Sequence, residues 1–275
     1  MTPHPLFRAL VDDAALFPPG DAPMAQAVPE HDRHTRAWYG DLVGPFLCTA
    51  QRLPELRALL SGGPLSLGLI ATRQTAAAAI TRVMGDPLLW LRAVDVPIGG
   101  IEEAHAAATV LTKVLPGDVT GYVEVPLTSS LPAVLDVLAG HGLRAKLRVG
   151  GLTATAFPTE RQVADVLHAC LARNLPVKFT AGLHHAVRHT APDTGFEHHG
   201  FLNVLLAVHL GLGGAAPDDL AATLAERDHH TVAKAIGDID DLAATRIRRA
   251  FTSYGSCSIS DPVNDLVGLG LLGKP

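Results

Sequence analysis

Residues 143–183 read LRAKLRVGGLTATAFPTERQVADVLHACLARNLPVKFTAGL, and their pattern predicts the architecture of the whole domain. It begins and ends with short apolar segments, at 143–151 and 175–183, that are typical of buried strands. The segment between them follows FPTE, has apolar residues three and four positions apart, and stops at Asn174, which is typical of a helix. A strand, a helix and a second strand in this order predict a βαβ unit with parallel strands.

The same alternation continues on both sides of this unit. Four apolar segments precede it, separated by Ala- and Leu-rich helical segments, and we expect strands at 44–50, 65–71, 88–96 and 119–127. Two candidates follow it, a weak one at 230–237 and a convincing one at 250–258. These segments predict one α/β domain over residues 1–275, a (β/α)8 barrel of the TIM type that is irregular in its last third. An open doubly wound sheet is the alternative.

The N-terminal segment 1–43 contains LVDDAALFPPG, in which an acidic pair opens an apolar turn that closes on Pro18, Pro19 and Gly20. We expect this segment to cap one end of the barrel.

Composition narrows the class of protein. The chain is 48% hydrophobic and 18% charged with a net charge of −5, which predicts a globular core and argues against a nucleic-acid surface. Its three cysteines are far apart, the N-terminus lacks a signal-peptide pattern, and no apolar run reaches the ~18 residues of a membrane span. We therefore expect a cytoplasmic protein with a small-molecule substrate and no membrane partner, and the sequence leaves a homo-oligomer open.

Four successive predicted strands carry charged residues, although strands buried on both faces should be apolar. Barrel enzymes place their chemistry at the carboxyl ends of the strands, so we expect these side chains to share one interior. Lys178, Glu124 and Lys146 are the candidate catalytic residues, and Arg148 and Asp95 are candidates for substrate binding. A structural network of ion pairs in a polar barrel core is the alternative.

Histidines gather just after the strand of Lys178, where five of the fourteen lie between residues 184 and 199. We expect the first two to act in acid–base catalysis and later polar residues to bind substrate: His184 and His185 for catalysis, and Arg188, His199, Asn203 and Ser256 for binding. No ordered metal motif such as HExxH is present, so we expect no cofactor, and a metal ion built on these histidines stays open.

The segment PVKFTAGL resembles the lysine strand of class I aldolases of the deoxyribose-phosphate type. In that family a lysine forms a Schiff base with the substrate carbonyl, a second lysine lowers its pKa, and an aspartate assists proton transfer. The resemblance implies these three roles for Lys178, Lys146 and Asp95. The segments LVDDAALFPPG, VKFTAGLHHAVRH, HGFLN and SYGSCS together resemble a group of actinobacterial-type proteins. That resemblance implies that the four segments form one site, and it carries no activity with it.

These observations predict an enzyme that acts on a small polar or anionic carbonyl or carboxylate compound as a lyase, aldolase or isomerase. Lys178 either attacks a carbonyl as a neutral amine of lowered pKa, or holds an anion while Glu124 or a histidine acts as the base. A metal-dependent hydrolase or isomerase that uses the His and Glu residues of 184–199 is the second hypothesis. A non-catalytic small-molecule binding protein is the third.

Overall fold

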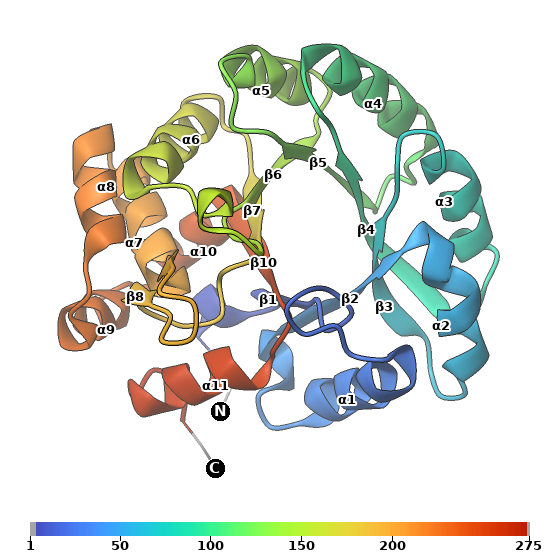
Figure 1. The fold of residues 1–275 in the computed structure, drawn as a ribbon, viewed down its shortest axis with the longest axis horizontal. Coiled ribbons are helices and arrows are strands. Elements are labelled where there is room, and N and C mark those ends of the chain that lie inside the picture. The colour runs from blue at the N-terminus through green and yellow to red at the C-terminus, as the bar shows by residue number, and fades with distance from the viewer. Residues whose placement is uncertain (1–3, 274–275) are drawn as a thin grey trace.

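The computed structural model describes residues 4–273, and its centre is a closed barrel of parallel strands (Figure 1). Around the barrel the strands follow the order β1-β10-β7-β6-β5-β4-β3-β2, and every neighbouring pair is parallel. The expected TIM-type barrel is therefore confirmed, and the open sheet is not formed. The strands are β1 (Val11–Asp13), β2 (Val43–Thr49), β3 (Leu65–Ile70), β4 (Leu89–Pro97), β5 (Thr120–Val125), β6 (Arg144–Arg148), β7 (Val177–Thr180) and β10 (Phe251–Ser256).

Helices surround the ring of strands and bury their apolar faces against it (Figure 1). Up to β7, a single α-helix follows each strand, as the sequence rhythm predicts. These helices are α1 (Met24–Arg36), α2 (Leu53–Leu59), α3 (Ala76–Met84), α4 (Ile101–Val114), α5 (Leu131–Gly140) and α6 (Glu160–Ala172). Among residues 4–273, none of the helices is both long enough and apolar enough to cross a bilayer.

The connection from β7 to β10 is the irregular last third. It contains a small antiparallel hairpin and then four helices in place of one. Its elements are β8 (His189–Thr190), β9 (Glu197–His198), α7 (Phe201–Leu212), α8 (Pro217–Ala225), α9 (His229–Gly237) and α10 (Asp241–Ala250), and α11 (Ser260–Gly268) follows β10.

The predicted start of α6 is confirmed in atomic detail. The Thr159 side chain accepts a hydrogen bond from the backbone N–H of Gln162 at 3.3 Å, and the Gln162 side chain accepts one from the Thr159 N–H at 2.9 Å. This reciprocal capping box satisfies two N–H groups that the first helical turn leaves without partners.

Two sequence expectations need correction. The segment 230–237 forms α9 and not a strand, because Asp228 caps its first turn and Val232 and Ile236 are buried one turn apart. The missing strand is β1, inside the N-terminal segment 1–43 that was expected only to cap the barrel. β1 is only three residues long, yet it pairs with both β10 and β2 and so closes the ring. Its helix α1 then packs on the outside.

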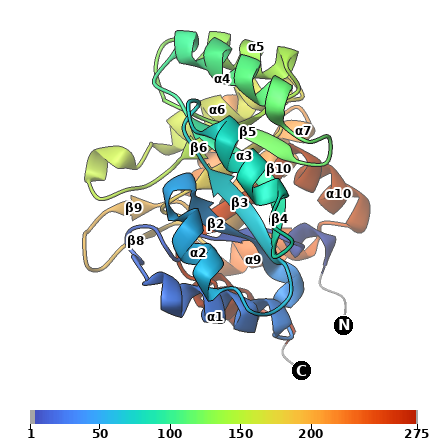
Figure 2. The same ribbon diagram turned by 90° about the vertical axis from the view of Figure 1, so that its right-hand side faces the viewer.

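Several loops gather at the carboxyl ends of the strands, which is the barrel's mouth. The loops after β6 and β7 project on the same side of the barrel (Figure 2), and they touch through Gly150 and Gly182. A Cβ atom on Gly150 would lie 2.6 Å from the Gly182 Cα, and Gly182 itself has a φ of +73°. These two glycines therefore let the loops approach to backbone contact.

We expect Gly150→Ala to lower the free energy of unfolding by about 1–3 kcal/mol, because the added methyl group meets backbone that cannot move aside cheaply. Urea denaturation measures the loss. Gly63→Ala is the matched control, since nothing lies within 4 Å of a Cβ at that position. Equal stabilities of the two variants would contradict the close approach of the loops.

Candidate active site

Six charged side chains from five strands meet inside the barrel and form a chain of alternating sign, which we name the interior ion-pair chain. From its enclosed end to its exposed end the members are Asp12 (β1), Lys178 (β7), Asp95 (β4), Lys146 (β6), Glu124 (β5) and Arg148 (β6). Three members are cations and three are anions, so the interior ion-pair chain has no net charge when all six side chains are ionised.

Asp95 lies at the centre of this chain. Its Oδ2 atom accepts from Lys178 Nζ and from Lys146 Nζ, each at 2.9 Å. Lys178 also contacts Asp12 Oδ2 at 3.3 Å, and Lys146 contacts Glu124 Oε2 at 3.1 Å. The structure thus brings together two lysines and one aspartate, the three residues that the aldolase resemblance selects.

The pKa of Lys178 shifts in the direction opposite to the one that a Schiff-base lysine requires. Burial lowers it, but the two carboxylates of Asp95 and Asp12 outweigh burial and raise the pKa above its ordinary value. The Lys178 side chain is only 2% exposed. Lys178 is therefore a protonated, enclosed ammonium group, and the expectation of a lowered pKa is wrong for this arrangement.

The three carboxyl groups of the interior ion-pair chain differ in the direction in which their pKa is shifted. Burial raises the pKa of Asp95, yet the two lysines outweigh it, and the net shift is downward. Glu124 behaves alike, with Lys146 and Arg148 lowering its pKa against burial. Asp12 has a raised pKa, because burial and the nearby charge of Asp95 outweigh the opposing effect of Lys178. Asp95 and Glu124 are thus the firmly ionised anions of the interior.

One member of the interior ion-pair chain and two side chains beside it cannot be identified from the sequence. Asp12 sits in a strand too short to show alternation, and Ser253 donates to its Oδ2 atom at 3.0 Å. The ring of Tyr122 lies 4.3 Å below the Lys178 ammonium, a cation–π contact. The second oxygen of Asp95, Oδ1, is buried and has no hydrogen-bond partner among residues 4–273.

The exposed end of the interior ion-pair chain opens into a pocket. This pocket lies at the carboxyl ends of three strands, and we name it the β4–β6 pocket. Its volume is about 250 Å³. Glu124 and Arg148 are its charged residues, and the others are apolar: Pro97, Ile98, Val125, Pro126, Leu127, Leu147 and Ala156. This is the position in which barrel enzymes carry their active sites.

The guanidinium of Arg148 is only partly engaged in this pocket. Its Nε atom donates to Glu124 Oε1 at 3.0 Å, and its side chain is 53% exposed. Neither terminal nitrogen has a hydrogen-bond partner within the described part of the chain, 4–273. Arg148 can therefore offer two parallel N–H donors to an anion that enters from solvent.

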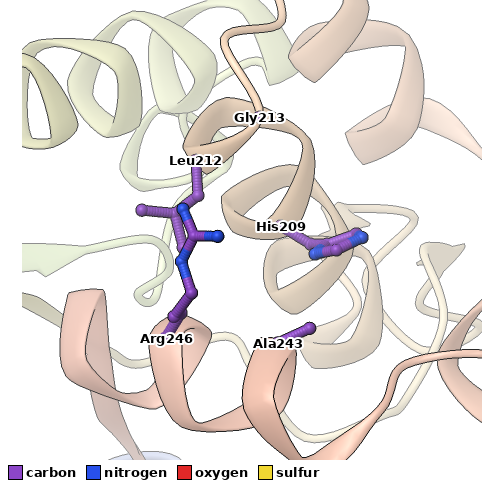
Figure 3. Close-up of a pocket in the computed structure, with 5 residues that line it drawn as sticks. All are labelled: His209, Leu212, Gly213, Ala243 and Arg246. Atoms are coloured by element: carbon purple, nitrogen blue, oxygen red, sulfur yellow. The ribbon is translucent and has the colours of Figure 1, made fainter.

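Another pocket lies outside the barrel, between α7 and α10 (Figure 3). His209 and Arg246 stand on its two sides, and its volume is about 90 Å³, room for about three water-sized groups. It contains no member of the ion-pair chain and lies among helices, away from the strand ends. We therefore assign the candidate site to the β4–β6 pocket.

His184 forms a second polar group at the mouth, beside the end of β10. Its Nδ1 atom lies 3.3 Å from Ser256 Oγ and 3.7 Å from Cys257 Sγ. Burial lowers the pKa of His184 to about 4, although Asp261 acts in the opposite direction. The ring is therefore neutral at pH 7, which suits a proton acceptor more than a charged anchor. His185 is half exposed and pairs with Asp265 at 3.1 Å.

Three of the expected substrate-binding residues serve the structure of the β7–β10 connection. Arg188 is buried and binds Glu160 at 2.6 Å and His199 at 3.2 Å. The other ring nitrogen of His199 bonds the Pro158 carbonyl at 2.8 Å. Asn203 accepts from the Arg188 N–H and donates to the carbonyls of Thr223 and Glu226. These contacts fasten the long connection to the barrel, and they leave no polar atom of the three residues directed at the β4–β6 pocket.

Arg92, a further charged residue of β4, is exposed, and its guanidinium lies 4.3 Å from the centre of the Trp90 ring. Among residues 4–273, no group of three or more His, Cys, Asp or Glu side chains is arranged to hold a metal ion.

We expect Lys178→Met to lower the free energy of unfolding by about 3–5 kcal/mol, because Asp12 and Asp95 both lose the ammonium group with which they pair. Chemical denaturation measures this. Lys234→Met removes an exposed lysine from a surface pair with Asp238, and it should cost less than about 1 kcal/mol. Similar losses in the two variants would show that the interior ion pairs do not constrain the fold.

His184 should make stability depend on pH. Its pKa is about 4 in the folded chain against about 6.5 when unfolded, so its contribution is complete above pH 6.5 and is lost as the pH falls toward 4. Between pH 7 and 5 the wild type should lose more unfolding free energy than His184→Asn. The difference stays below the limit of about 1.4 kcal/mol per pH unit for one proton. Parallel curves of stability against pH would contradict the lowered pKa.

No protein-family model matches the chain, and a comparison with curated proteins finds no match. Among solved structures, the chain is similar to one titled as Rhizobium etli pyruvate carboxylase T882A with the allosteric activator acetyl coenzyme A. The identity is 10% and the TM-score 0.44, over 89% of this chain and 24% of that chain. The chain thus spans about a quarter of the length of that protein, and the similarity carries no argument about the site. The resemblance to actinobacterial-type proteins stays a prediction.

Proposed function

We propose that the protein is an enzyme that acts on a small anionic carbonyl or carboxylate compound, by acid–base chemistry of the lyase or isomerase type. The single observation that supports this most is Glu124, an ionised carboxylate in the wall of the β4–β6 pocket between two cations. Arg148 binds the substrate anion, and Glu124 takes a proton from the carbon next to the bound carbonyl or carboxylate group. The electron pair of the broken C–H bond moves onto the oxygen of that group as an enolate, which Arg148 pairs with, and Glu124 returns the proton to form the product. Lys146 holds Glu124 in place from the buried side.

Substrate binding itself would increase the basicity of Glu124. In the free protein Lys146 and Arg148 keep its pKa low, which makes it a weak base. A substrate carboxylate on Arg148 adds a negative charge nearby and neutralises the arginine, and both effects raise the pKa of Glu124. A base whose pKa moves toward the working pH on binding is better suited to proton abstraction.

Lys178 has a supporting part in this proposal. It keeps Asp95 charged, Asp95 fixes Lys146, and Lys146 fixes Glu124. Because Lys178 is enclosed and paired with two carboxylates, it is a positioning residue and does not touch the substrate.

A Schiff-base aldolase is the second candidate, and the joint contact of Lys178 and Lys146 with Asp95 favours it. It requires Lys178 to lose its proton and to become reachable from the mouth. The metal-dependent and non-catalytic alternatives have no comparable observation in their favour.

Proton exchange tests the proposed base without knowledge of the full reaction. Small oxo acids and their saturated counterparts are incubated with the protein in D2O, and loss of the α-hydrogen signal is followed by NMR. Glu124→Gln keeps the volume of the side chain and should lower the exchange rate by about 10²–10⁴-fold, the usual contribution of a general base. Glu102→Gln, in the exposed first turn of α4, should retain the wild-type rate.

Borohydride reduction during the same incubation separates the two candidates. We expect no adduct on the Lys178 peptide by mass spectrometry. An adduct there would establish the Schiff-base candidate, and full exchange by Glu124→Gln would remove Glu124 as the base.

A further inference from the structure

We infer that the substrate of the β4–β6 pocket is a monocarboxylate with an aliphatic tail, and not a phosphorylated or polyhydroxylated compound. The inference rests on the proposed function for the choice of pocket, and it adds the chemical class of the ligand. It is argued from the charge, the wall and the size of the pocket.

The charges of the pocket fit one negative charge on the ligand. Arg148 and Glu124 compensate each other in the free protein, and the terminal nitrogens of Arg148 remain open to an anion. The nearest further cation, Lys146, is 2% exposed and already contacts Asp95 and Glu124. A phosphate monoester would bring close to two negative charges against a single available guanidinium and an ionised glutamate.

The wall of the pocket fits a hydrocarbon. Seven of its nine residues have purely apolar side chains, namely Pro97, Ile98, Val125, Pro126, Leu127, Leu147 and Ala156. None of the nine is Ser, Thr, Asn, Gln or Tyr, so their side chains offer a sugar no neutral hydrogen-bonding group. Hydroxyl groups placed against this wall would lose their water without finding a partner.

The rim of the pocket also has an apolar side chain that a tail would cover. Leu127 follows β5 and is 39% exposed. A tail that runs from Arg148 along the wall would remove Leu127 from water and gain the corresponding hydrophobic free energy.

The volume of about 250 Å³ has room for about eight water-sized groups at ~30 Å³ each. A carboxylate fills about three of them. A carboxylic acid with a tail of roughly five carbons would fill this volume.

Titration of the full chain with the straight-chain acids from acetate to octanoate, by calorimetry, tests the class directly. We expect affinity to rise two- to fourfold with each methylene group and to level off near about six carbons. The primary amides should bind at least about tenfold more weakly than the acids, because they lack the charge that Arg148 pairs with. Inorganic phosphate should bind no more tightly than acetate.

Two variants with matched controls locate the binding. Arg148→Gln should weaken every acid at least about tenfold, whereas Arg161→Gln, a similarly exposed arginine on α6, should change nothing. Leu127→Ser should weaken hexanoate several-fold and leave acetate unchanged. Leu210→Ser on α7 has the same 39% exposure and should leave both acids unchanged.

Any one of three results would overturn the inference. These are an affinity that does not change with tail length, acid binding that Arg148→Gln leaves unchanged, and tighter binding of phosphate than of hexanoate. Failure of the proposed function gives a different pattern. Tail-dependent binding with no exchange in any acid, or with exchange that survives Glu124→Gln, would support the ligand class and remove the acid–base role. Glu124-dependent turnover of a hydrophilic substrate would support the acid–base role and remove the ligand class.

Discussion

The contact of two lysine ammonium groups with one aspartate oxygen is the constraint on which the rest of the interior depends. A charge in a barrel core is tolerated only if it is compensated at close range. Asp95 compensates Lys178 and Lys146 at 2.9 Å each, and each lysine then requires a further carboxylate, Asp12 on one side and Glu124 on the other. Removal of any inner member leaves at least one neighbour undercompensated.

The interior ion-pair chain links enclosed charges to the mouth of the barrel. Asp12 and Lys178 are enclosed, whereas Arg148 at the other end is half exposed and lines a pocket. Glu124 and Arg148 at the exposed end line the pocket that a ligand can enter, so the proposed acid–base chemistry involves these two residues. The buried end acts through geometry, because Lys146 fixes the side chain of Glu124 from below. Lys146 and the exposed Arg148 together lower the pKa of Glu124 against the effect of burial.

Much of the barrel follows from sequence periodicity, and so does most of the interior ion-pair chain. Charged residues on successive strands correctly place Glu124, Lys146, Arg148 and Lys178 together, and the aldolase resemblance adds Asp95. Asp12 could not be assigned to the interior from the sequence, because a strand of three residues is too short to show apolar alternation. An acidic pair before a proline turn is, in addition, typical of a loop. The direction of the Lys178 pKa shift could not be predicted for the same reason, since Asp12 is one of the two carboxylates that raise this pKa.

The polar residues of the β7–β10 connection are misleading for a different reason. Arg188, His199 and Asn203 follow a strand end and are chemically suited to catalysis, yet their partners lie 11 to 41 positions away in the sequence. Whether a buried polar residue binds a ligand or fastens a loop depends on those distant partners.

The charge state of the Lys178 amine is the most direct test of the interior ion-pair chain. It can be followed by NMR of the lysine Cε and Nζ resonances across pH, with assignment by single Lys→Arg variants among the five lysines. We predict that the Lys178 ammonium persists beyond pH ~10.4, the ordinary lysine pKa, for as long as the protein stays folded. An amine at Lys178 that loses its proton near neutral pH would contradict the interior ion-pair chain and restore the nucleophilic lysine.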